Sequence, residues 1–242
     1  MCTVTFVPQN NHYFLTSNRD EKAARPKAVA PAVYADYNTK LLYPKDAAAN
    51  GSWIALNQLG NAAVLLNGAF VNHEPAPPYR KSRGLIFLDI IASAEPTDWF
   101  AEVNLYKIEP FTVVILQEGK LYECRWDGMR KHYQQLDEKQ AHIWSSATLY
   151  PDDVISKRKQ WFSKWLADYP QPSQKDIFLF HQFASDGDIQ NDVLMNRDGH
   201  MLTVSITGIE VSSEKGKMQY LDLQDGSSTI KELSFETSSV LS

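Results

Sequence analysis

The 242-residue chain is 43% hydrophobic and 12% aromatic, which suffices for a large core in one or at most two domains. Its net charge of −5, with both signs mixed along the chain, excludes a basic surface for nucleic acid, and its apolar runs fall far short of the ~20 residues that span a bilayer. No signal peptide is recognisable, and two cysteines, Cys2 and Cys124, form no disulfide framework, so we expect a reducing, cytoplasmic location.

The chain begins with a candidate hairpin, in which residues 1–7 and 13–21 are strand-like and the turn formers of residues 8–12 lie between them. If Met1 is removed, Cys2 becomes the N-terminal residue and carries both a thiol and an α-amino group. That amine titrates near ~7.7 to 8.0 and a free thiol near ~8.5, so the amine can take the thiol proton directly or through a water. The alternative is that Cys2 is a small apolar residue opening a buried strand.

Pairing of Val7 with Tyr13 across this turn places Cys2 opposite Asn18. Because side chains alternate between faces, Asn18 and Asp20 then share the face of Cys2, whereas the intervening arginine points away. A slip of one residue reverses this assignment. Instead of a catalytic role, that arginine and the following aspartate can also form a solvated ion pair at a strand end.

Residues 23–32 are rich in Ala and Pro and are expected to form an irregular connection. Residues 53–57 and 62–68 are typical of two strands joined by a turn, and the second is apolar throughout, so both of its faces should be buried. Asn67 lies where this strand ends, and its amide can donate to a developing oxyanion. The alternative is that Asn67 and Gly68 only form a turn.

Four helices are predicted in the middle of the chain. Ser82 can cap a helix over residues 83–94, and a short helix starts at Thr97. A clear amphipathic pattern from Asp152 to Tyr169 predicts a long helix, and another follows over residues 174–184. Further strands are predicted at residues 111–117, 121–126, 129–134, 142–146, 192–196, 201–211 and 217–223.

Strands at both ends of the chain and helices in its middle favour an α+β protein over a repeated βαβ pattern. We expect two stacked antiparallel sheets with helices outside, which is a four-layer αββα sandwich. No linker divides the chain, so residues 1–225 are expected to form a single domain and residues 226–242 a Ser- and Thr-rich tail that is only loosely attached.

Several blocks together resemble the transport and Golgi organisation 2 family, also called NRDE proteins after the Asn18-Arg19-Asp20-Glu21 tetrapeptide. The blocks are Met1-Cys2, Ser17 to Glu21, Leu66-Asn67 and Ser82-Arg83-Gly84. Weaker similarity at Phe111 to Val114 and from Trp144 to Trp161 extends the resemblance over most of the chain.

This family resembles a branch of the N-terminal nucleophile hydrolases, whose αββα architecture agrees with the predicted layers. The resemblance implies that Cys2 is the nucleophile, that Arg19 and Asp20 orient its thiolate and amine, and that Asn67 lines the oxyanion hole. The relatives separate this Arg and Asp by two residues, whereas Arg19 and Asp20 are adjacent. We therefore expect a turn or bulge beginning at Asn18 that brings at least one of them within reach of Cys2.

Three positions are candidate substrate-binding or supporting residues. Asn18 belongs to the NRDE block. Ser146 ends a Trp144-Ser145-Ser146 triplet that stands where family members usually carry Leu-Ser-Asn, and His200 ends an Asp198-Gly199-His200 turn that replaces Gly-Thr-Arg.

Two functions of different class are consistent with these features. The first is a hydrolase that cleaves a non-peptide linear amide C–N bond of a small molecule through an acyl-enzyme on Cys2. The second is a non-catalytic protein that binds or carries a small apolar ligand, for example haem, as proposed for eukaryotic members of the family. The six histidines are scattered, and neither a metal-binding motif nor a Gly-rich nucleotide loop occurs, so we expect no metal and no cofactor. The enzyme hypothesis predicts an activated thiol at Cys2 and an ordinary one at Cys124.

Overall fold

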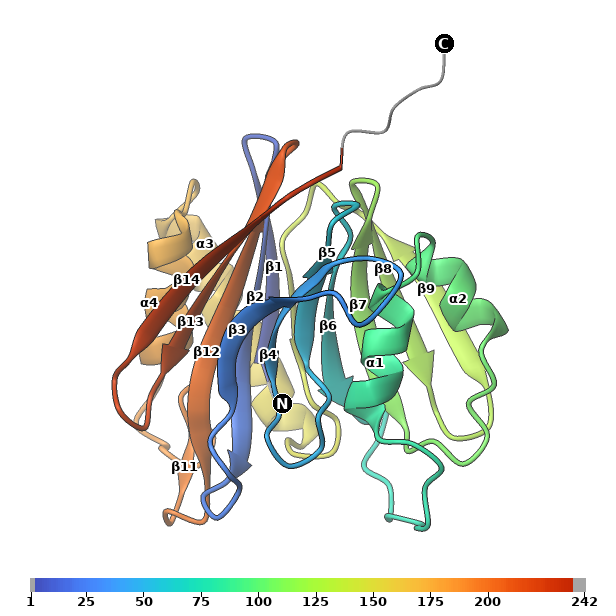
Figure 1. Ribbon diagram of the computed structural model, residues 1–242. Helices are drawn as coiled ribbons and strands as arrows, with labels where there is room; N and C mark the ends of the chain where they lie inside the picture. Colours follow the sequence, from blue (N-terminus) through green and yellow to red (C-terminus); the bar gives the residue numbers. More distant parts are fainter. Residues whose placement is uncertain (1–2, 237–242) are drawn as a thin grey trace.

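The computed structural model describes residues 3–236, which form two antiparallel sheets stacked face to face with helices on both outer sides (Figure 1). Within that range sheet A has seven strands in the order β10-β1-β2-β12-β13-β14, with β11 paired to β12. The bounds are β1 Thr3–Gln9, β2 His12–Lys22, β10 His142–Ser145, β11 Asn196–Arg197, β12 Met201–Val211, β13 Lys215–Asp222 and β14 Ser228–Ser234.

Sheet B, counted over the same described residues, has seven strands in the simple order β3 to β9. Each of its strands is antiparallel to the next. The bounds are β3 Val29–Tyr34, β4 Leu41–Lys45, β5 Ile54–Asn57, β6 Ala62–Asn67, β7 Phe111–Gln117, β8 Lys120–Trp126 and β9 Lys131–Leu136.

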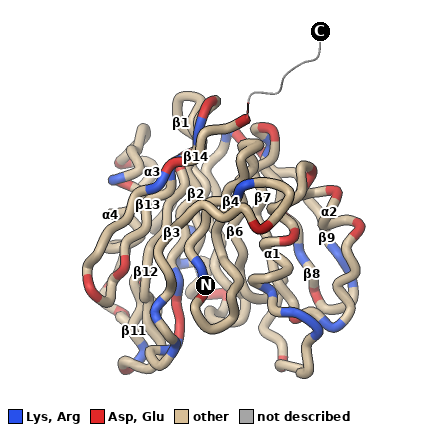
Figure 2. The backbone as a smooth tube through the Cα atoms, viewed as in Figure 1, with Lys and Arg blue, Asp and Glu red and all other residues tan. Residues whose placement is uncertain are grey.

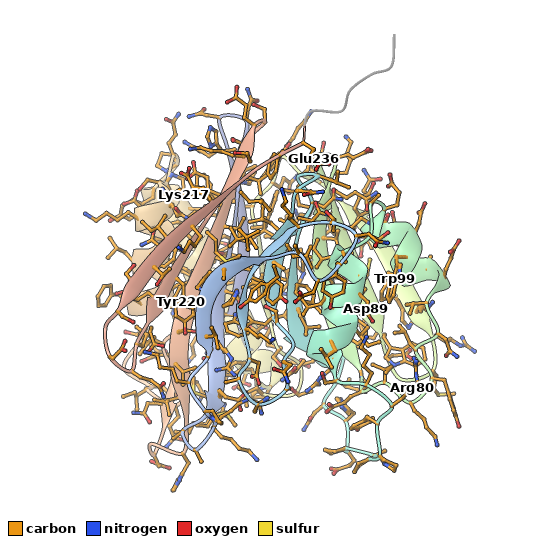
Figure 3. All side chains as sticks on the ribbon, viewed as in Figure 1. Arg80, Asp89, Trp99, Lys217, Tyr220 and Glu236 are labelled. Carbon is orange, nitrogen blue, oxygen red and sulfur yellow. The ribbon has the colours of Figure 1, made fainter. Side chains whose placement is uncertain are left out.

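Helices cover the outer face of each sheet. α1 (Arg83–Ile91) and α2 (Pro96–Glu102) pack on sheet B, and α3 (Asp152–Asp168) and α4 (Gln174–Phe183) pack on sheet A. Apolar side chains fill three layers, one between the sheets and one under each helix pair (Figure 3). Charged residues concentrate in loops and at strand ends (Figure 2). The prediction of an α+β four-layer sandwich is confirmed.

Strand β6 shows how the sequence determines this layering. Ala62, Val64 and Leu66 face the layer between the sheets, whereas Ala63 and Leu65 face α1. A strand that is buried on both faces needs apolar residues at successive positions, and all but the last residue of β6 are buried. The expectation that this strand is buried on both sides is therefore confirmed.

The opening hairpin is present, but its predicted register is wrong by one residue. Val7 pairs with Phe14 rather than with Tyr13, because the turn consists of Asn10 and Asn11 alone. Their φ angles are 47° and 63°, and a two-residue turn with both φ values positive matches the twist of the flanking strands. Asparagine tolerates this conformation, so the turn is shorter than expected and the two faces of β2 are exchanged.

Three other segments differ from expectation. Residues 23–32 are not wholly irregular, because β3 begins at Val29 and, as an edge strand, accommodates Pro31. The predicted strand at 192–196 is strand only at Asn196. Part of the expected tail forms β14, which pairs with β13 and buries Leu233. No helix among residues 3–236 is long and apolar enough to cross a membrane.

Candidate active site

The NRDE block lies in β2 at the centre of sheet A, and its side chains alternate between the two faces of the sheet. Thr3, the first described residue of β1, pairs with Asn18 and also with Ser145 of β10. Asn18 and Asp20 face α3 and α4, whereas Arg19 faces sheet B. Cys2, the predicted nucleophile, is bonded to Thr3 and lies outside the described residues.

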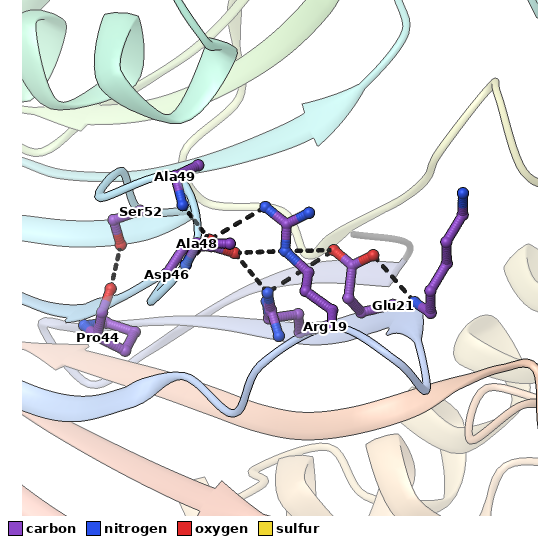
Figure 4. Close-up of polar contacts among 9 residues, drawn as sticks. Arg19, Glu21, Pro44, Asp46, Ala48, Ala49 and Ser52 are labelled. Atoms are coloured by element: carbon purple, nitrogen blue, oxygen red, sulfur yellow. Dashed lines mark hydrogen bonds and ion pairs between the residues drawn. The ribbon is translucent and has the colours of Figure 1, made fainter.

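Arg19 joins the two sheets through a buried ion pair with Asp46 (Figure 4). Its Nη2 lies 2.6 Å from Asp46 Oδ2, its guanidinium carbon lies 4.7 Å from the ring centre of Trp53, and only 5% of its side chain is exposed. Arg25 binds the same carboxylate with two hydrogen bonds of 2.9 and 3.0 Å. The Arg19 guanidinium is thus fixed in orientation, and the alternative of a solvated ion pair is wrong for this residue.

Asp46 is held as an anion by its neighbours. Burial alone would raise the pKa of its carboxyl, but the hydrogen bonds from Arg25 and the Ala49 N–H, with the charges of Arg25 and Arg19, lower that pKa overall. Ala48 N–H also donates to it at 3.0 Å. The loop between β4 and β5 therefore supplies a permanent negative charge that positions Arg19.

A cleft of about 720 Å³ opens beside this ion pair. Arg19 and Asn67 both line it, one from β2 and the other from the end of β6. The remaining walls come from the β4–β5 loop and from residues 79–85 at the start of α1, with Glu21, Arg25, Leu65 and Glu109 completing them. Five cationic side chains and three anionic ones line the cleft, so it is net positive. A second groove of about 460 Å³ lies between α3 and α4, on the far side of sheet A.

Asn67 is one of the residues that line this cleft. Its side chain makes no hydrogen bond to any of residues 3–236, so its N–H₂ group is available to a ligand. Its backbone carbonyl accepts a hydrogen bond of 2.9 Å from Ser146 Oγ, which ties the end of β6 to the end of β10. Ser146 is fully used in this way, because its hydroxyl also lies 3.0 Å from Thr148 Oγ1. The structure brings Ser146 next to Asn67 as a support, on the side of sheet A.

Asp20 lies on the other face of β2 from Arg19. Its two carboxylate oxygens accept hydrogen bonds from Tyr150 at 2.8 Å and from Thr203 at 2.5 Å. The bulge expected at Asn18 is not in β2, which is regular; it lies in β12, where Val204 is extra between the partners of Arg19 and Asp20. Because β2 remains regular, the two adjacent side chains cannot both enter the cleft.

Asn18 holds sheet A against α4. Its Nδ2 donates to the carbonyls of His181 at 3.2 Å and Val193 at 2.7 Å, so its Oδ1 accepts from His181 Nδ1 at 2.5 Å. This fixes the neutral imidazole with its proton on Nδ1, and its Nε2 accepts from Thr5. Complete burial and then the charge of Arg158 lower the pKa of His181 to about 3. Asn18 is therefore a supporting residue remote from the cleft.

Arg158 anchors the described start of β1. This fully buried guanidinium on α3 donates to Thr3 Oγ1 at 2.6 Å and to the carbonyls of Asn191 and Asp192, and it stacks on Tyr150 at 3.7 Å.

His200, a candidate supporting residue, is exposed in the turn between β11 and β12 and does not line the cleft. No group of three or more His, Cys, Asp or Glu side chains in the described part of the chain is arranged to hold a metal ion.

The profile of the family described as transport and Golgi organisation 2 matches residues 1–217. The chain belongs to this family. A search among curated proteins finds no match.

Solved structures similar to this family member are N-terminal nucleophile hydrolase-like. Penicillin V acylase from Agrobacterium tumefaciens has a TM-score of 0.51 at 11% identity, over 100% of this chain and 93% of the other. A variant of the conjugated bile acid hydrolase from Clostridium perfringens has a TM-score of 0.59 at 11% identity, over 100% and 98%. The Caenorhabditis elegans orthologue of N-acylethanolamine-hydrolyzing acid amidase has a TM-score of 0.55 at 12% identity, over 86% and 92%. These likenesses establish the fold.

Sequence reasoning missed the residues that shape the cleft of this family member. Asp46 directly follows β4, Trp53 directly precedes β5, and Glu109, which pairs with Arg83 at 3.1 Å, precedes β7. Asp46 and Glu109 lie outside the predicted strands and helices, and Trp53 is predicted only as the first residue of a strand. The one available signal was the Ser82-Arg83-Gly84 block, whose three residues all line the cleft.

Proposed function

We propose that this protein is an N-terminal cysteine hydrolase that cleaves a linear amide C–N bond of a small molecule through an acyl-enzyme on Cys2. The observation that carries the proposal is that Arg19 of one sheet and Asn67 of the other line a single cleft. Amide hydrolysis through a thioester needs a thiolate, a base and a donor to the oxyanion. The similarity to an acylase, a conjugated bile acid hydrolase and an acid amidase supports this reaction class.

In the sequence, Cys2 precedes Val4, the first inter-sheet residue of β1 in the described range, by two positions. Val4 and Phe6 belong to the apolar layer between the sheets, which is the side that Arg19 faces, and Thr3 faces α3. Alternation along the strand therefore supports a position for Cys2 on the side of Arg19, and the register found for the hairpin favours this arrangement over the predicted one.

The reaction uses the chain's own groups. After removal of Met1, the α-amino group of Cys2 takes the thiol proton, and the thiolate adds to the amide carbon while the carbonyl oxygen becomes an oxyanion that accepts from Asn67 Nδ2. The C–N bond breaks as the amine leaves with the proton from the ammonium group. Water then adds to the thioester, the C–S bond breaks, and a carboxylic acid leaves with the thiol restored.

The other candidate residues support this chemistry in different ways. The fixed charge of Arg19 favours the thiolate over the thiol. Asp20 fixes β2 against Tyr150 and β12 from the other face, and Ser146 holds the backbone of Asn67. We also assign the protein to the cytoplasm, because a thiol nucleophile must remain reduced.

The test combines intact mass, which reports removal of Met1, with turnover of a panel of N-acyl amides. We expect no turnover in Cys2→Ala, and a fall in kcat of roughly 100-fold in Asn67→Ala, which removes one oxyanion donor. Asn72→Ala is the matched control, because it removes the same amide from the exposed loop after β6 and should leave kcat unchanged.

The competing function gives a different result in the same experiment. Three results together would show that the hydrolase proposal is wrong. Protein that has lost Met1 would turn over no amide, and iodoacetamide would label its Cys2 slowly, at a rate that does not vary around neutral pH. The Cys2→Ser variant would bind an apolar ligand such as haem as well as the parent protein does. The protein is then a binding protein built on the same fold.

A further inference from the structure

Three loops meet at one end of sheet B, beside the mouth of the cleft. Asn67 of β6 pairs with Phe111 of β7, and Phe111 pairs with Trp126 of β8. The segments that follow β6, precede β7 and follow β8 therefore lie at the same end of the sheet. We call residues 68–82, 103–110 and 127–131 the tip loops; they lie at the lower end of the sheet, below β6, β7 and β8, in Figure 1. Arg80 joins two of them, because its N–H donates to Lys107 O at 2.9 Å and its guanidinium to the carbonyl of Asn104.

The tip loops expose large apolar side chains. Met129 is 86% exposed, Val71 72%, Tyr106 68% and Phe70 53%. Single exposed apolar residues are ordinary on a protein surface, but here four of them lie on three loops at the same end of sheet B. Arg125, whose guanidinium is paired with Glu123, stacks on Phe70 at 4.8 Å.

The charge of the tip loops is opposite to that of the whole chain. They carry five cations and three acids, although the chain has a net charge of −5. The cations are Arg80, Lys81, Lys107, Arg130 and Lys131, and the acids are Glu74, Glu109 and Asp127. Figure 2 shows Lys and Arg at the lower ends of β8 and β9, and Figure 3 shows Arg80 extending outward there.

Most of these cations have no carboxylate partner, whereas two of the acids are engaged. Among the described residues only Lys81 pairs with a carboxylate, that of Asp89. Arg80 and Lys131 donate to backbone carbonyls, which leaves their charge uncompensated, although Glu102 at the end of α2 lies near Lys131. Glu109 is paired with Arg83 and Asp127 with His132.

We propose that the tip loops dock this protein on a membrane surface that contains anionic phospholipid. Lys and Arg near such a surface are attracted to its headgroups, and exposed Met, Val, Tyr and Phe side chains insert at the boundary between headgroups and acyl chains. A second copy of the chain fits this patch poorly, because a two-fold contact would bring the same cations together. This attachment is peripheral and needs no spanning helix.

If the tip loops contact the membrane, the cleft lies next to the bilayer. Tyr79, Arg80 and Lys81 belong to the tip loops and also line the cleft. A ligand that resides in the membrane would then enter the cleft without crossing bulk water. The docking surface does not depend on whether Cys2 is catalytic.

The experiment is flotation of the full chain with vesicles of phosphatidylcholine, with and without phosphatidylserine. We expect binding only to the anionic vesicles and loss of that binding in high salt. Lys107→Glu with Arg130→Glu should weaken partitioning at least roughly 25-fold, since each cation near the surface contributes about a five-fold factor. Val71→Ser with Met129→Ser should weaken it several-fold without changing its salt dependence.

The matched control carries the same kinds of change on the opposite side of the molecule. Phe183, 69% exposed on α4, and Lys159, exposed on α3, lie outside sheet A, so Phe183→Ser with Lys159→Glu should leave partitioning unchanged. Thermal unfolding of each variant shows whether the fold is retained. Failure of the folded protein to bind anionic vesicles, equal losses in tip and control variants, or a dimer that only the tip variants disrupt would each overturn the proposal.

Discussion

At the residue scale, the NRDE block is divided between two tasks by strand alternation. Arg19 reaches across to Asp46 in sheet B, whereas Asn18 and Asp20 bind groups that lie over the other face of sheet A. Each of these three residues is at most 4% exposed, so their buried polar groups depend on partners that are far away in the sequence. The block therefore connects both layers that flank sheet A.

The buried His181 makes stability depend on pH. Its folded pKa of about 3 lies below the ordinary value of 6.5, so between these values the unfolded chain binds a proton that the folded chain does not. Stability is therefore complete above pH 6.5 and falls as the pH drops toward 3, by up to about 1.4 kcal/mol per pH unit. In His181→Gln this contribution to the pH dependence of stability should disappear. The free energy of unfolding, measured in urea between pH 6.5 and 5, should then change less with pH than it does in the parent protein.

His200→Gln is the control for that measurement, because this histidine is exposed in the β11–β12 turn and makes no buried hydrogen bond with its ring among the described residues. It should keep the pH slope of the parent. An unchanged slope in His181→Gln would mean that another group causes the acid sensitivity.

Residue types alone indicated several of these positions but not their partners. The NRDE tetrapeptide and Asn67 are recognisable in the sequence, yet nothing near Arg19 in the chain points to Asp46, and nothing near Asn18 points to His181. Such pairs arise only when sheets and helices pack, and a buried polar group accepts whichever partner that packing supplies.

At the element scale, the first hairpin shows why a correct element can carry an incorrect face assignment. The sequence predicts both strands within a few residues of β1 and β2, but it predicts a turn of five residues where Asn10 and Asn11 suffice. Strand side chains repeat every two residues, so this small error exchanges the faces of Arg19 and Asp20. The exchange matters because only one face borders the cleft.

The start of α1 depends on close backbone contact between two glycines. A Cβ on Gly51 would lie 2.5 Å from the carbonyl carbon of Gly84, and a Cβ on Gly84 would lie 3.0 Å from Ser52 O. Gly51→Ala should therefore lower the free energy of unfolding by about 2 kcal/mol, and Gly84→Ala by less, as measured in urea. Alanine normally stabilises a helix relative to glycine, so a stabilising Gly84→Ala would contradict this close contact.

Strand β14 lies beyond the predicted domain boundary at residue 225, and we propose that it contributes to the stability of the same folded unit. Leu233 is only 7% exposed, and Phe235 packs against the layer between the sheets. Leu233→Ala should cost about 2 kcal/mol in chemical unfolding. Ile230→Ala, at a position 53% exposed on the same strand, should change stability by less than about 0.5 kcal/mol. Equal small effects would indicate that β14 is attached without contributing.

At the scale of the whole molecule, the layers were predictable because strands dominate both ends of the chain and helices its middle. The cleft was not predictable, because its walls come from the β4–β5 loop, the loop before α1 and the segment before β7. Loops carry no periodic signal, and these loops become neighbours only after the sheets stack. Their charge and shape are therefore consequences of the tertiary arrangement.

Cys124 provides a probe of the layer between sheet B and α1. The sequence predicts an ordinary thiol at Cys124, between Glu123 and Arg125, whereas its side chain faces the apolar layer under α1 and α2 and is fully buried. Burial, with a smaller effect of Glu123, raises the pKa of its thiol to about 12, so at pH 8 the thiolate fraction is on the order of one part in ten thousand.

Labelling of Cys124 should therefore require opening of that layer. In Cys2→Ser it is the one remaining thiol of the chain, so iodoacetamide reports on it alone. We expect labelling in native buffer to be at least roughly 1,000-fold slower than in strong denaturant, since a stability of ~5 kcal/mol leaves very little unfolded protein. The rate should rise with urea in parallel with global unfolding followed by circular dichroism. Labelling within about ten-fold of the unfolded thiol, or independent of urea below the unfolding transition, would show that α1 and α2 separate from sheet B by local opening while the rest of the sandwich stays folded.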